Sequence, residues 1–141
     1  MSKNRMMAAA VVGLTAIAPW GSGWAAGGFD GTWSATVNCP TEGDVEGYVW
    51  QFPVRVQGGH LSGKYVNPND PGNYGVLSGS ISAGGDAALS MSGKTGVPAY
   101  SVKHVAQHSP IHYTASAHFD ATSGSGKRVQ QRSCDLSFAK G

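Results

Sequence analysis

The chain has 141 residues, of which ten are basic and eight acidic, and 21 are glycine. A formal net charge of +2 is too small for the basic surface of a nucleic-acid-binding protein. Charged residues make up only 13% of the chain, and aromatic and β-branched residues recur at short intervals. This composition favours strands and turns over helices.

The first 25 residues have the pattern of a secretory signal peptide. Lys3 and Arg5 precede an apolar run over residues 6–18, and a helix-breaking stretch rich in small residues follows over residues 19–26. The run is shorter than the about 20 residues that span a bilayer, so we expect no stable membrane anchor. We expect cleavage after Ala25, because cleavage after Ala26 would put Trp24 at a position that requires a small residue. The mature chain, residues 26–141, would form a single domain in the periplasm or outside the cell.

The chain has two cysteines, Cys39 and Cys134. In an oxidising compartment they have one pairing, and they lack the C-x-x-C spacing of a redox pair. We therefore predict a structural disulfide. If the two residues face each other across antiparallel strands, Val37 faces Leu136 and the apolar faces of both strands coincide.

Apolar and polar residues alternate along most of the mature chain, which is the period of a β-strand. Gly58-Gly59 and residues 82–86 predict hairpin turns, and the first turn places Phe52 opposite Tyr65. The alternating segments are residues 32–37, 48–57, 61–65, 77–81, 87–91 and 113–119, and residues 127–140 form the last strand.

Three other segments have less regular patterns. Asn67–Tyr74 is rich in Asn and Pro, so we expect a polar loop there, and residues 121–126 predict a Ser/Gly turn. Between residues 95 and 110 we expect only one short strand, around Tyr100 and Val102.

About eight short strands, with no ten-residue stretch of helical period, predict an all-β domain. We predict an antiparallel up-and-down β-barrel over residues 26–141, with a small β-sandwich as the alternative. Pairing of the first strand with the last would remove two exposed sheet edges, and the disulfide requires these strands to meet.

Gly31-Thr32-Trp33 on the first predicted strand resembles the Gly-x-Trp opening of calycin barrels, the lipocalin and avidin-like families. The resemblance implies that Trp33 closes one end of the barrel beneath a cation from the last strand. The disulfide register places Lys140 there, where lipocalins have an arginine.

A second resemblance extends over nearly all of the mature chain and concerns a group of small exported bacterial proteins of unknown function. It supports the compartment and the fold class, and it implies no catalytic residue. The segments that carry it are Phe29–Ser34, Asn38–Pro40, Leu77–Gly79, Gly124–Arg128 and Arg132–Leu136.

His104, His108 and His112 recur every four residues, a spacing that on a helix would suit zinc or copper. Pro110 interrupts the run, and the neighbouring pattern indicates extended chain. In a strand, with about 3.3 Å per residue, these histidines would lie too far apart to share one ion. We expect solvated histidines and no metal or cofactor.

The remaining polar residues form no recognisable catalytic motif, such as a nucleophile elbow or H-E-x-x-H, so no catalytic residue is predicted. Three carboxylates within residues 42–46 indicate a solvated acidic turn rather than a calcium site. Lys127, Arg128 and Arg132 would either bind a phosphate or carboxylate or serve as charges that protect a sheet edge.

Six large aromatic residues fall on the inward faces of the predicted strands and would either fill the barrel or line a pocket. We favour a filled core. If the interior is hollow, Trp50, Tyr65 and Tyr113 are the candidate ligand-binding residues. The six are Tyr48, Trp50, Phe52, Tyr65, Tyr113 and Phe119.

These observations predict a non-enzymatic binding or interaction module that acts outside the cytoplasm. Its partner would be a small apolar ligand or an exported protein. The alternative is an inhibitor of an exported hydrolase that inserts the Asn67–Tyr74 loop into its target.

Overall fold

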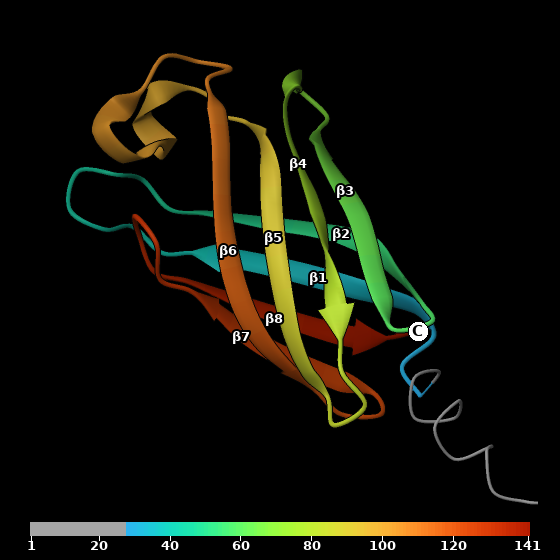
Figure 1. Ribbon diagram of the computed structural model, residues 1–141. Helices are drawn as coiled ribbons and strands as arrows, with labels where there is room; N and C mark the ends of the chain where they lie inside the picture. The colour runs from blue at the N-terminus through green and yellow to red at the C-terminus, as the bar shows by residue number, and fades with distance from the viewer. Residues whose placement is uncertain (1–27) are drawn as a thin grey trace, which may run out of the picture.

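The computed structural model describes residues 28–141, in which eight antiparallel strands follow one another around a closed barrel (Figure 1). The all-β up-and-down barrel is therefore confirmed, whereas the predicted signal peptide, residues 1–25, lies outside the described residues. Within residues 28–141, no helix is long and apolar enough to cross a membrane. The strands are β1 (Gly31–Cys39), β2 (Tyr48–Gln57), β3 (His60–Asn67), β4 (Asp70–Ile81), β5 (Asp86–Lys94), β6 (Pro110–Phe119), β7 (Ser123–Arg128) and β8 (Cys134–Lys140).

A disulfide links the first and last strands. Cys39 ends β1 and Cys134 begins β8, and their Cα atoms lie 4.3 Å apart. The strands pair in the register that places Val37 opposite Leu136. Both the predicted disulfide and the predicted register are confirmed, because the alternation of β1 and β8 turns their apolar residues toward the same interior.

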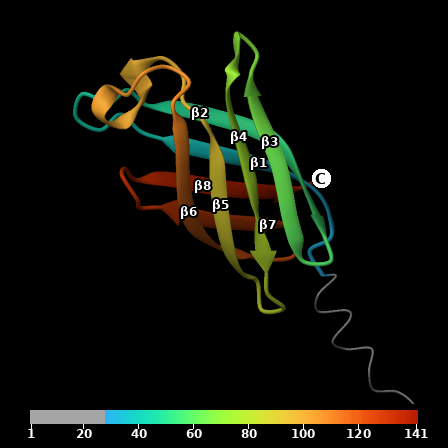
Figure 2. The same cartoon turned by 45° about the horizontal axis from the view of Figure 1, so that its top comes forward.

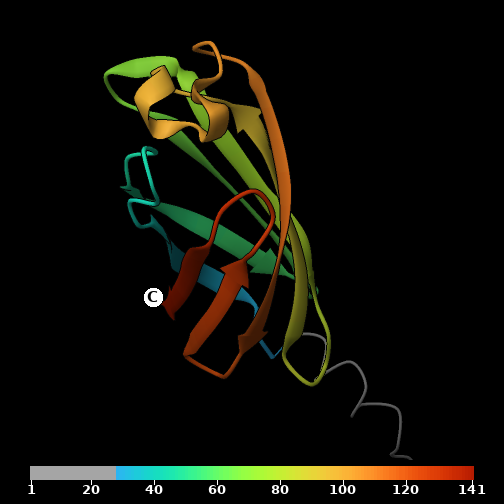
Figure 3. The ribbon, with the colours of Figure 1, turned by 90° about the vertical axis from the view of Figure 1, so that its left-hand side faces the viewer.

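The two ends of the barrel differ. One end carries the β1–β2, β3–β4, β5–β6 and β7–β8 connections, and we call it the open end (Figure 3). The tight turns after β2, β4 and β6 lie at the other end, which we call the packed end.

Two seams between strands are paired only near the packed end. β2 pairs with β3 from Val54 to Gln57, and β6 pairs with β7 from Ser116 to Phe119. The two groups of four strands therefore separate toward the open end, and β3 to β6 run across the direction of the other four (Figure 2). The predicted hairpin register is confirmed for Val54, which lies opposite Gly63. The ladder ends before it reaches Phe52 and Tyr65, which are not paired in it, but their ring centroids lie 6.1 Å apart.

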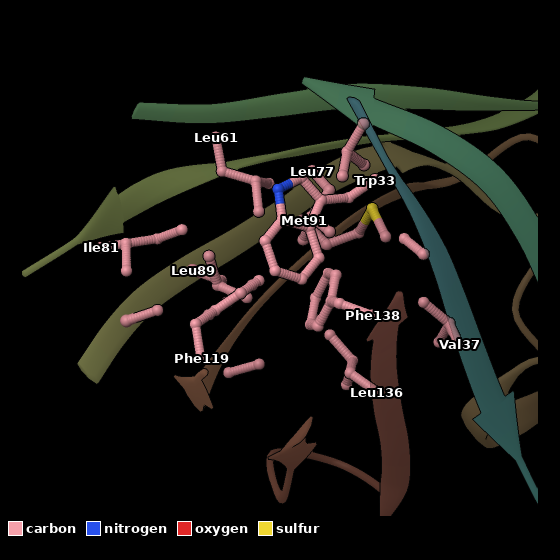
Figure 4. Packing of buried hydrophobic residues seen from close by; sticks show 14 of the residues in the cluster. Trp33, Val37, Leu61, Leu77, Ile81, Leu89, Met91, Phe119, Leu136 and Phe138 are labelled. Atoms are coloured by element: carbon pink, nitrogen blue, oxygen red, sulfur yellow. The ribbon is translucent and has the colours of Figure 1, made fainter. Parts of the chain in front are cut away.

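Large apolar side chains fill the packed end (Figure 4). Trp33 is fully buried, and its ring meets that of Phe119 edge-on with centroids 5.2 Å apart. The indole Nε1 donates a hydrogen bond of 2.8 Å to the Phe29 carbonyl. Lys140 lies opposite Trp33 in the ladder with Nζ 5.8 Å from the ring centroid, so the predicted closure of this end by a Trp and a cation is confirmed.

The predicted loop Asn67–Tyr74 is wrong, because this segment is a tight hairpin in which β3 ends at Asn67 and β4 begins at Asp70. The Asn67 Oδ1 accepts a hydrogen bond from the Asn69 amide, which is the local bond of an Asx turn. The Asn67 amide group also donates to the Asn73 side chain. The asparagines therefore stabilise a short turn instead of an extended loop.

The short strand expected around Tyr100 and Val102 is also wrong. The β5–β6 connection contains two 3₁₀ turns, η2 (Pro98–Tyr100) and η3 (Val102–His104). Lys103 within η3 has a φ of 62°, a left-handed conformation that interrupts any extended chain.

The expected turn over residues 121–126 and single last strand over 127–140 are wrong, since β7 begins at Ser123 and a connection separates it from β8. The inward residues of β7 begin with Gly124 and Gly126. A Cβ at Gly126 would lie 2.6 Å from the Ala117 Cβ, and one at Gly124 would lie 2.9 Å from the Phe119 ring. The close approach of β6 requires glycine here, which gives this strand the composition of a turn.

Candidate functional site

The open end of the barrel contains a cavity of about 610 Å³. This volume lies within the range of small-molecule sites in proteins. The three candidate ligand-binding residues, Trp50, Tyr65 and Tyr113, all line it. The barrel is therefore filled at the packed end and hollow at the open end, so neither the filled core nor the pocket describes the whole interior.

Aromatic rings from β2 and β3 form one wall of the cavity. Trp50 stacks on Tyr65 with ring centroids 4.3 Å apart and planes 15° from parallel, and Tyr48 lies 5.3 Å from Trp50. A Cβ at Gly75 would lie 2.7 Å from the Trp50 ring, so β4 needs glycine there to admit the indole. The stacked rings bridge the seam where the β2–β3 ladder has ended.

Tyr113 of β6 and Arg128 of β7 meet inside the barrel. The Arg128 guanidinium lies over the Tyr113 ring, 3.8 Å from its centroid. Both side chains line the cavity, and Arg128 is only 1% exposed and Tyr113 2% exposed. The Tyr113 hydroxyl is buried and has no hydrogen-bond partner within the described part of the chain, residues 28–141. An unpaired buried donor lowers the stability of the fold, so its presence beside a cavity indicates a group that donates a hydrogen bond to a bound ligand.

The charge of Arg128 has no acidic partner. Its Nε donates to the Gln130 carbonyl at 3.0 Å, and one Nη donates to the Gln131 side chain at 2.6 Å. The other Nη lies 3.9 Å from the Cys134 sulfur, and the hydroxyls of Tyr48 and Tyr113 are close enough to the guanidinium for it to oppose, in part, the rise that burial causes in the pKa of both. All ion pairs among residues 28–141 are formed by histidines or Lys127. A buried cation therefore faces the cavity with donors left over.

Arg132, in the β7–β8 connection, holds the loops of the open end together. One Nη donates to the Pro40 carbonyl at 2.8 Å, and the other donates to the Tyr100 carbonyl at 3.2 Å. The side chain is only 4% exposed. Arg132 therefore links the β1–β2 connection to the β5–β6 connection.

The alternative that these basic residues protect an exposed sheet edge does not hold for Arg128 and Arg132, because Arg128 is buried in the barrel and Arg132 is buried among the loops of the open end. Lys127 instead points outward and pairs with Asp135 at 2.6 Å. The alternation of β7 therefore separates two neighbouring cations, one to each face of the sheet.

Burial changes the titration of the polar groups in the cavity. It raises the pKa of the Tyr113 hydroxyl and that of the Tyr48 hydroxyl, and the positive charges of Arg128 and Arg132 only partly oppose this at Tyr48. Both hydroxyls therefore remain protonated at neutral pH and can donate hydrogen bonds. Burial also lowers the pKa of Arg128, yet a guanidinium keeps its charge at neutral pH.

Asp70 joins the β3–β4 hairpin to the β5–β6 connection at the rim of the cavity. Its carboxylate accepts hydrogen bonds from the Gln107 side chain at 3.0 Å and lies 2.8 Å from His108 Nε2. The hydrogen bond from Gln107, and then that from His108, lowers the pKa of Asp70. These contacts hold two sides of the rim together.

The three histidines of the run lie in different surroundings. His104 Nε2 lies 3.0 Å from the Asp44 carbonyl oxygen, His108 contacts Asp70, and His112 is exposed on β6. In the part of the chain that the structure describes, no three His, Cys, Asp or Glu side chains are grouped as metal ligands. The three carboxylates of residues 42–46 lie on an exposed turn closed by a bridge between Glu42 and Val45.

Sequence reasoning named three aromatic residues of this cavity but did not place Arg128 inside it. The sequence did contain the pattern: Gly124, Gly126 and Arg128 lie two residues apart, so all three share one face of a strand.

Comparisons with family models, with curated proteins and with solved structures found no match for this chain.

Proposed function

We propose that this protein is an exported, non-enzymatic binding protein that holds a small, largely apolar ligand in the open-end cavity. The observation that carries the proposal is the cavity of about 610 Å³, which is walled by stacked aromatic rings and reaches the fully packed half of the barrel. Rings that line a preformed hollow bury a ligand without first having to rearrange.

Export is supported by the signal-like first 25 residues and by the disulfide, since such bonds persist in oxidising compartments. It is tested by expressing the whole chain in a bacterium and measuring the mass of the protein in the periplasmic fraction. A chain that begins at Ala26 supports the proposal. Recovery of the uncut chain in the cytoplasm would refute export.

Ligand binding is tested with the exported protein and 1-bromooctane, a short apolar molecule whose bromine quenches tryptophan fluorescence on contact. In the chain after residue 25, Trp33 and Trp50 are the tryptophans. Trp33→Phe leaves Trp50, at the cavity, and we expect saturable quenching. Trp50→Phe leaves Trp33, in the packed end, and we expect almost none. Equal quenching of both variants, or of neither, would contradict binding in this cavity.

The inhibitor alternative loses its main support. It required a long polar loop at Asn67–Tyr74, and that segment is a paired hairpin with Asn73 buried beneath it. The open-end cavity therefore supports binding of a small ligand better than this hairpin supports inhibition of a hydrolase.

A further inference from the structure

A buried positive charge in an otherwise aromatic cavity restricts the chemistry of the ligand. Arg128 is 1% exposed and faces the cavity, and its hydrogen bonds go to neutral groups, the Gln130 carbonyl and the Gln131 amide. A desolvated guanidinium without a counter-charge is costly to the folded state, so it is a feature that a purely apolar ligand leaves unexplained.

The uncharged polar groups around Arg128 are also hydrogen-bond donors. Tyr113 lines the cavity and its buried hydroxyl has no hydrogen-bond partner among residues 28–141, while Tyr48 lines the cavity and lies half-buried nearby. Because burial raises the pKa of both tyrosines, both keep their hydrogen at neutral pH. A guanidinium and two phenolic hydroxyls that converge on one hollow form a set of donors that an oxygen anion would satisfy.

We infer that the ligand is an amphipathic carboxylic acid, whose carboxylate binds Arg128 and the Tyr113 hydroxyl while its apolar body lies against Trp50 and Tyr65. This assignment rests on the proposed binding function and names the class of ligand. It goes beyond a purely apolar cargo, for which the aromatic wall alone would suffice.

The arrangement of free hydrogen-bond donors favours a carboxylate over a phosphate. Arg132, the other buried cation of the cavity, already donates to the carbonyls of Pro40, Glu46 and Tyr100 and is held among the loops. At the rim, Asp70 and Lys94 bring opposite charges to the lining. Of the two buried guanidiniums, Arg128 has an Nη without an oxygen acceptor beside the cavity, whereas both Nη atoms of Arg132 are held by carbonyls and only its Nε lacks a partner among residues 28–141. A carboxylate fits this smaller set of free donors better than a phosphate, which has three oxygens to satisfy.

The test uses the exported protein and three probes with one aromatic body: 1-naphthaleneacetate, the uncharged 1-naphthaleneacetamide and 1-naphthylmethylphosphonate. Affinities are measured by calorimetry. We expect the carboxylate to bind about 10- to 100-fold more tightly than the amide, the range for hydrogen bonds to a charged partner. At a pH at which the phosphonate carries two charges, it should bind more weakly than the carboxylate.

Two variants test whether Arg128 and Tyr113 bind the carboxylate. Arg128→Gln should reduce the ratio of carboxylate to amide affinity to about 1, with the amide affinity retained as evidence of a folded cavity. Tyr113→Phe removes only an unpartnered hydroxyl, so it should leave the melting temperature unchanged or higher while it weakens carboxylate binding about 3- to 10-fold. Lys127→Gln, on the outward face of the same strand, is the control and should leave the ratio unchanged.

The outcomes separate the two proposals. If all three probes fail to bind and 1-bromooctane also leaves Trp50 unquenched, the binding function itself is wrong. If the amide binds as tightly as the carboxylate, or if Arg128→Gln and Tyr113→Phe both retain the carboxylate preference, the cavity binds apolar ligands and the acid assignment is wrong. Tighter binding of the phosphonate would overturn the choice of a carboxylate.

Discussion

Truncation of Trp33 tests whether the packed end is the part of the barrel that stabilises the fold. The side chain is 0% exposed, and its ring packs edge-on against Phe119. Removal of a buried Trp side chain costs about 3 to 5 kcal/mol, because the space it leaves collapses only in part. Trp33→Ala also removes the donor to the Phe29 carbonyl, so we expect a loss near the upper end of that range.

Trp50→Ala is the matched comparison, since it removes the same side chain from the open end. Trp50 is half-buried and already borders a hollow, so its truncation enlarges an existing cavity. We expect a loss of about 1 to 2 kcal/mol. Urea unfolding followed by far-UV circular dichroism measures both losses with the disulfide intact, and Trp33→Phe provides a milder variant if Trp33→Ala does not fold. The reasoning is refuted if Trp50→Ala proves more destabilising than Trp33→Ala.

Two further predictions concern the covalent and ionic links at the open end. The disulfide closes a loop with a sequence separation of 95 residues, so Cys39→Ser should lower the free energy of unfolding by up to about 4.7 kcal/mol, and a loss below 1 kcal/mol in urea unfolding would contradict this. Because hydrogen bonds from Gln107 and His108 depress the pKa of Asp70, this carboxylate stabilises the fold above its unfolded pKa, and its contribution is lost as the pH falls through the lower folded pKa. Asp70→Asn should therefore flatten the dependence of the melting temperature on pH below about pH 4, and an unchanged profile would show that the rim contact adds no stability.

Strand pattern and disulfide register were predictable because both depend on local alternation. In β1, the spacing of Trp33 and Val37 requires one face to be buried, and the cysteine pair then aligns β8 without further information. The same reasoning failed where glycine replaced the apolar residues. Gly124 and Gly126 lie inward because β6 approaches closely, and a single sequence does not show which strands will approach.

The cavity was not predictable for a related reason. Its space results from the separation of β2 from β3 and of β6 from β7, and this depends on where each ladder ends rather than on which residues alternate. Trp50 and Tyr65 have the inward pattern of core residues, and nothing in that pattern distinguishes a ring that fills a core from a ring that lines a hollow. The aromatic candidates were therefore found, but the volume between them was not.

The position of Arg128 depends on the same register that buries the core. β7 pairs with β8 so that Arg128 lies opposite Cys134, and Cys134 is bonded to Cys39 of β1. A slip of one residue between β7 and β8 would turn Lys127 inward and Arg128 to solvent. It would also drive Gly124 and Gly126 outward and place serine side chains against Phe119 and Ala117, where there is no room even for a Cβ. The packing of the apolar half of the barrel therefore holds a cation in the hollow half, and the cost of burying that charge is offset by contacts elsewhere in the strand.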